Sequence, residues 1–138
     1  MKIGLYCYSP ASINTMRALS INIPNFIDNI NVYFYSDDIA KFYFNEFDVS
    51  KNDTSKLSFI HNDIDESVKE LDLFIYGTGS GHELELTIPN RIKELSNTLK
   101  TLSINDILWD SKEGLNRRFK CSPDYLIISS DFEKKEIV

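Results

Sequence analysis

Residues 71–85 read LDLFIYGTGSGHELE, an apolar run followed by three glycines within five residues and then by polar residues typical of a helix start. The apolar residues of the run leave no polar face, which favours a strand buried on both sides, as in a parallel sheet covered by helices. Gly77, Gly79 and Gly81 tolerate positive φ and expose backbone N–H groups. The stretch therefore predicts a buried strand, a tight turn and a helix.

The glycine-rich turn has two interpretations. Thr78, Ser80 and His82 place hydroxyl and imidazole groups beside exposed N–H groups, which predicts a cradle for an anion or a hydroxyl. The alternative is an ordinary strand-to-helix turn in which Ser80 caps the helix and His82 is a turn residue. Both interpretations stay open on the sequence alone.

The chain before this stretch begins with a second predicted strand, Lys2–Tyr8, and a helix over Ala11–Ile23 that Pro24 is expected to close. The connecting residues 8–14, YSPASIN, lack the GxGxxG pattern that grips a pyrophosphate in dinucleotide-binding units. Ser9, Ser12 and Asn14 could still bond a ligand, and the alternative for Ser12 is a helix cap.

The rest of the chain continues to alternate strands with helices. Strands are predicted at 31–36, 57–60, 101–104 and 124–129, and helices at 37–47, 63–70, 83–100 and 131–136, with Pro89 expected to bend or divide the third of these helices. Alternation of this kind predicts an α/β fold, specifically a single three-layer Rossmann-like domain over residues 1–138. Its mostly parallel sheet should have about five strands in the order 3-2-1-4-5.

In this order the switch point lies between strands 2–8 and 71–76, and ligands of open α/β sheets bind at such points. Residues 9–14 and 77–83 should therefore face one pocket, and residues 105–119 could form its wall. An arginine there could hold a phosphate or carboxylate through two parallel hydrogen bonds. The expected ligand residues in addition to Ser9, Ser12, Asn14 and the turn 77–82 are Glu83, Trp109, Asp110, Asn116, Arg117 and Arg118.

Composition restricts the partners. The 138 residues carry a net charge of −6 without a basic run, so duplex nucleic acid and an anionic membrane are poor partners, whereas a small anion needs only one or two arginines. Cys7 and Cys121 have no CxxC spacing, and the carboxylates at 63–66 are accounted for by a helix dipole, so we expect no disulfide, metal or cofactor. The start MKIGLYCYS lacks a cleavage site and predicts a cytoplasmic protein.

Four segments in this order resemble the amino-terminal Rossmann-like half of GT-B glycosyltransferases and related nucleotide-sugar proteins. They are GTGSGHELE at 77–85, INDILWD at 104–110, LNRRF at 115–119 and PDYLIISSD at 123–131. This resemblance implies a nucleotide-sugar ligand. A weaker resemblance, to nucleoside deoxyribosyltransferase-like folds, implies a nucleophilic glutamate on the helix, at Glu83 or Glu85. The alternative for both glutamates is stabilisation of the first helical turn.

These observations predict a non-catalytic protein that binds, and could sequester, a nucleotide, a nucleotide-sugar or a similar phosphorylated molecule. The second hypothesis is an enzyme that cleaves or transfers at a glycosidic bond with Glu83 or Glu85. The third is an interaction subunit, since a small parallel sheet often pairs with another protein or forms a homodimer.

Overall fold

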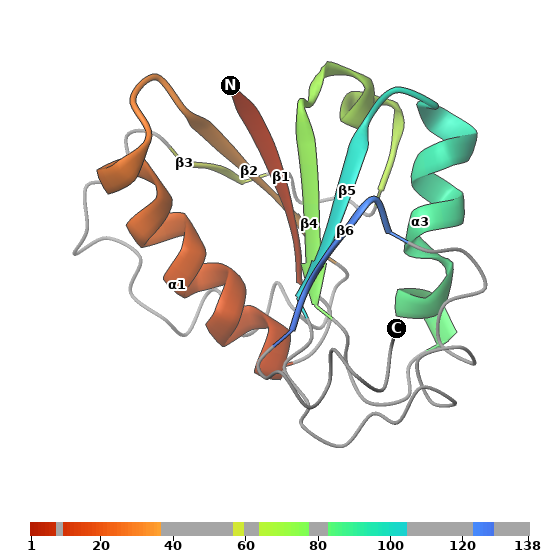
Figure 1. Ribbon diagram of the computed structural model, residues 1–138, viewed down its shortest axis with the longest axis horizontal. Coiled ribbons are helices and arrows are strands. Elements are labelled where there is room, and N and C mark those ends of the chain that lie inside the picture. The colour runs from red at the N-terminus through yellow and green to blue at the C-terminus, as the bar shows by residue number, and fades with distance from the viewer. Residues whose placement is uncertain (8–9, 37–56, 60–63, 78–82, 105–122, 129–138) are drawn as a thin grey trace.

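The computed structural model of the chain describes residues 1–7, 10–36, 57–59, 64–77, 83–104 and 123–128, and one parallel sheet runs through these segments (Figure 1). Its described strands are β1 (Lys2–Cys7), β2 (Asn31–Ser36), β3 (Leu57–Phe59), β4 (Leu73–Gly77), β5 (Lys100–Ile104) and β6 (Tyr125–Ile127). Their order is β3-β2-β1-β4-β5-β6, and every neighbouring pair is parallel. The predicted Rossmann-like α/β fold and the order 3-2-1-4-5 are confirmed, with β6 added beyond β5.

Helices cover both faces of the sheet. Helix α1 (Pro10–Phe26) packs on one face over β1 and β4, and helix α3 (Glu83–Leu95) lies on the other face, as Figure 1 shows. Side chains alternate along each strand, so odd and even positions reach different cores. In β1, Ile3 and Leu5 join the core beneath α1, whereas Tyr6 joins the core beneath α3. Strand β1 is therefore buried on both faces. The apolar run at 71–76 had predicted the same for the neighbouring strand β4.

Aromatic side chains fill the core beneath α3. The register aligns Tyr35 of β2, Tyr6 of β1 and Tyr76 of β4 in one row across the sheet, and all three are buried. The ring of Phe74, two positions before Tyr76 on the same face of β4, lies 5.4 Å from that of Tyr35. Gly4 makes room for this ring, because a Cβ there would lie 2.8 Å from Cδ2 of Phe74.

A short 3-10 helix, η2 (Glu66–Glu70), connects to β4 on the α3 side. Asp65 caps it: its Oδ1 accepts from the Ser67 N–H at 2.9 Å and from the Ser67 hydroxyl at 2.5 Å. Since the serine proton goes to the carboxylate, the Tyr35 hydroxyl donates the 2.7 Å bond that it shares with Ser67. The short acidic helix predicted over 63–70 is therefore present as a 3-10 helix that begins later, at Glu66, because Asp65 caps it. Glu66 in its first turn agrees with the dipole interpretation of the acidic residues.

Both long helices end differently from the prediction. Pro24 lies within α1, which continues to Phe26, because a proline in the final turn removes only one hydrogen bond and Ile27 N–H still donates to the Ile23 carbonyl at 3.1 Å. Asn29, at φ 56°, then turns the chain.

No helix within the described segments is long and apolar enough to cross a membrane.

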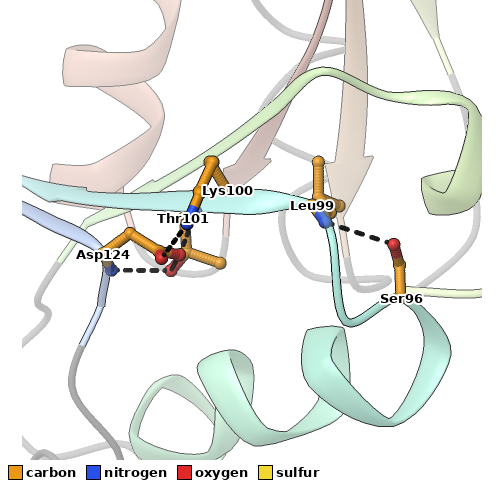
Figure 2. A network of polar contacts seen from close by, with 5 residues as sticks. All are labelled: Ser96, Leu99, Lys100, Thr101 and Asp124. Carbon is orange, nitrogen blue, oxygen red and sulfur yellow. Dashed lines mark hydrogen bonds and ion pairs between the residues drawn. The ribbon is translucent and has the colours of Figure 1, made fainter.

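Helix α3 ends at Leu95, not at Lys100, and it remains one helix around Pro89. Figure 2 shows why the chain turns here: the Ser96 hydroxyl accepts from the Leu99 N–H at 3.2 Å. The Ser96 N–H also closes the last helical turn by donating to the Ile92 carbonyl at 2.7 Å. Leu99, expected on the helical stripe, instead enters the core just before β5. The predicted helices at 37–47 and 131–136 lie outside the described residues.

Candidate functional site

The carboxyl edge of the sheet contains the predicted switch point. β1 pairs with β4, with Tyr6 opposite Tyr76, although β2 and β3 lie between the two in sequence. From β1 the chain continues to β2 on one side, and from β4 it continues to β5 on the other side. The chain therefore leaves these two adjacent strands in opposite directions, which is the arrangement that forms a ligand crevice in open α/β sheets.

The end of β4 is in close contact with the start of α1 through Gly77 and Ser12. A Cβ on Gly77, the last residue of β4, would lie 3.3 Å from Cβ of Ser12, and Ser12 is only 2% exposed. The φ of Gly77 is outside the left-handed region. Gly77 therefore allows the close approach of α1, and the position does not use the positive φ that a glycine tolerates.

The start of α1 is the other side of this contact. The helix begins at Pro10, a residue favoured at the first helical position, so Ser12 is the third helical residue and not the predicted cap. The first turn of α1 contains no acidic residue. Because the N–H groups of a first turn point out of the helix and carry partial positive charge, this turn presents a favourable potential to an anion at the edge.

The other predicted site residues divide into three groups. Asn14 is exposed on α1, about 200° around the helix from Ser12. Glu83 and Glu85 lie in the first turn of α3, where acidic residues favour a helix start. The remaining ones lie outside the described residues: Ser9, Thr78, Gly79, Ser80, Gly81, His82, Trp109, Asp110, Asn116, Arg117 and Arg118.

At the opposite, amino edge a carboxylate fixes β6 to β5. Asp124 accepts hydrogen bonds from the Lys100 ammonium at 2.9 Å, the Thr101 N–H at 3.0 Å and the Thr101 hydroxyl at 3.1 Å (Figure 2). The Asp124 N–H lies 3.1 Å from the Thr101 hydroxyl oxygen and donates to it. The bond from Lys100, followed by the bond from the Thr101 backbone, lowers the pKa of the Asp124 carboxyl to about 2. This cluster is structural, since its bonds join the two strands to each other.

Ser103, near the carboxyl end of β5, is a polar residue that the sequence analysis did not select. It pairs with Tyr76 and lies on the α3 face of the sheet, because its neighbours Leu102 and Ile104 pack on the α1 side. Its side chain is fully buried, and among the described residues its Oγ has no hydrogen-bond partner. A serine between two apolar residues at the end of a strand was the available signal.

The described residues contain no group of three His, Cys, Asp or Glu side chains that could hold a metal ion. No protein-family model, curated protein or solved structure matches the chain. The resemblance to the glycosyltransferase half therefore stays a prediction from residues 71–131.

Proposed function

We propose that this protein binds a small phosphorylated ligand of the nucleotide or nucleotide-sugar class at the carboxyl edge of its sheet, without transforming it. The observation that carries the proposal is the contact between Gly77 and Ser12 at the switch point. It places Gly77, the first residue of the predicted glycine-rich turn, beside the first turn of α1. The N–H groups of that helical turn, together with those that the sequence predicts for the glycine-rich turn, are the kind of donor that phosphate oxygens accept from.

The charge distribution supports a small ligand more than a polymer. The chain has a net charge of −6, so a polyanion would meet overall repulsion, whereas a single phosphate group needs favourable potential only at its own site. The amino end of α1 supplies a positive potential through the helix dipole, and no carboxylate in its first turn cancels this potential. The arginines at 117 and 118 stay predicted contacts for the same phosphate.

Calorimetric titration tests this function with two series of compounds: uridine, UMP, UDP and UDP-glucose, and the corresponding adenosine compounds. We expect binding that requires at least one phosphate. A Gly77→Val variant should weaken binding at least about tenfold, because its branched side chain would displace Ser12 and the start of α1.

Two comparisons make the titration decisive. Circular dichroism should show that Gly77→Val stays folded, and Asn14→Ala supplies a variant on the exposed side of the same helix. If Asn14 contacts the ligand, as the sequence analysis predicts, its variant weakens binding too and the site extends around the amino end of α1. Failure of every compound to bind the parent protein would contradict the proposed function.

A further inference from the structure

Buried hydroxyl groups in β5 differ sharply in how they are satisfied. Thr101 is 1% exposed, and its hydroxyl both donates to and accepts from Asp124. Ser103 is two positions further along the same face and is 0% exposed, but within the described part of the chain its Oγ has no partner. A buried hydroxyl without a hydrogen bond costs folding free energy, so its presence calls for a physical reason.

Ser103 is close to the proposed ligand site. It lies one residue before the end of β5 and opposite Tyr76, which directly precedes Gly77. Ser103 therefore lies one residue from the carboxyl edge, where the proposed ligand binds, and its hydroxyl is on the α3 face of the sheet, whereas the contact of Gly77 with Ser12 is on the α1 face. Thr101, by contrast, lies toward the amino edge, where it holds β6 in place.

We propose that Ser103 is a ligand-contacting residue, whose hydroxyl donates a hydrogen bond to an oxygen of the bound phosphate or sugar. This inference rests on the proposed function and assigns a residue of the same site. Because the side chain is fully buried without ligand, contact requires a local rearrangement, which the binding free energy must offset. The hydroxyl is already desolvated, so its bond to a ligand oxygen does not first require the removal of water from the serine.

The test compares Ser103→Ala with Thr101→Val, two variants that each remove one buried hydroxyl from the same face of β5. UDP, UDP-glucose, ADP and ADP-glucose serve as titrants, and thermal unfolding is measured in parallel. For Ser103→Ala we expect affinity to fall about five- to thirtyfold with an unchanged or higher Tm, since a hydroxyl unbonded in the free protein is lost. For Thr101→Val we expect a lower Tm, because the bonds to Asp124 are broken, and unchanged affinity.

The outcomes separate the two proposals. Loss of affinity for the diphosphates and the diphosphate-sugars alike assigns the Ser103 bond to a phosphate oxygen, and loss for the sugars alone assigns it to a sugar oxygen. Equal binding by Ser103→Ala and the parent overturns the role of Ser103 and leaves the proposed function standing. A Tm several degrees lower for Ser103→Ala also overturns it, because the hydroxyl would then be bonded within the free protein. If the parent binds none of the compounds, both proposals fail.

Discussion

Gly4 shows how one missing side chain shapes the core beneath α3. A Cβ at this position would lie 2.7 Å from Cδ1 of Leu71 and 2.8 Å from Cδ2 of Phe74. The Leu71 methyl group could rotate away, but the Phe74 ring packs against both Tyr6 and Tyr35. The glycine is therefore a requirement of packing in the middle of a strand, where glycine otherwise weakens the structure.

We expect Gly4→Ala to lower the free energy of unfolding by about 1–3 kcal/mol, because overpacking forces the Phe74 ring out of its position. Urea unfolding at neutral pH measures this change. Gly77→Ala is the matched control, since the new Cβ would meet its nearest neighbour at 3.3 Å and needs only a small shift. Equal stability of the Gly4 variant and the parent would show that the core accommodates the new Cβ without losing stability.

At the scale of elements, the sequence predicted the strands better than the helix ends. Residues 71–76 indicated a buried strand because a short apolar run without a polar face is typical of a strand covered on both sides, and β4 confirms it. Helix ends depended on single local features of the backbone and side chains. The bond from the Leu99 N–H to Ser96 ends α3 early, and Pro24 is tolerated because it lies in a final turn. Spacing along the chain does not reveal either circumstance.

The strand pairing at the carboxyl edge was predictable, but the side-chain contacts made there were not. Alternating strands and helices predicted an open parallel sheet, and the usual strand order of such sheets, 3-2-1-4-5, predicted the pairing of β1 with β4. That Ser12 packs on Gly77, and that Ser103 is buried without a partner among the described residues, depends on the strand register and on the side-chain packing around each residue. The pattern of residue types along the chain reveals neither the register nor the packing.

The attachment of β6 to β5 should depend on pH through Asp124. Its folded pKa, about 2, is lower than its ordinary value of 3.8, so its stabilising contribution is complete above the ordinary value and is lost as the pH falls toward 2. We expect Asp124→Asn to be less stable than the parent at pH 6 and to approach it as the pH falls from about 4 to about 2. Urea unfolding across this range measures the difference.

Other carboxylates titrate in the same interval, so only the difference between parent and variant is informative. Glu94→Gln, which changes an exposed carboxylate on α3, is the control and should follow the parent at every pH. A constant difference between Asp124→Asn and the parent from about pH 6 to about pH 2 would show that the charge of Asp124 does not secure β6.

At the scale of the whole molecule, the two edges of the sheet have different roles. Polar bonds join distant segments at the amino edge: the Lys2 N–H donates to Asp72 at 2.7 Å, the Lys2 ammonium pairs with Glu70 at 2.9 Å, and Asp124 holds β5. The carboxyl edge has the close approach of Gly77 to Ser12 and the starts of α1 and α3. These polar bonds are thus at the opposite end of the strands from the proposed ligand site, and substitutions at one end should leave the other largely unaffected.

Binding without chemistry is the expected behaviour of the whole protein, and the two glutamates of α3 allow a direct test. Glu83 and Glu85 are two positions apart in one helix, about 200° around its axis, so at most one of these positions faces the sheet edge. Glycosidic cleavage generally needs two carboxyl groups, one on each side of the bond. We therefore expect UDP-glucose or ADP-glucose incubated with stoichiometric protein to be recovered intact by chromatography. Multiple turnovers that Glu83→Gln or Glu85→Gln alone abolishes would instead assign glycosidic chemistry to that glutamate, whereas turnover that survives both substitutions would indicate a contaminating enzyme.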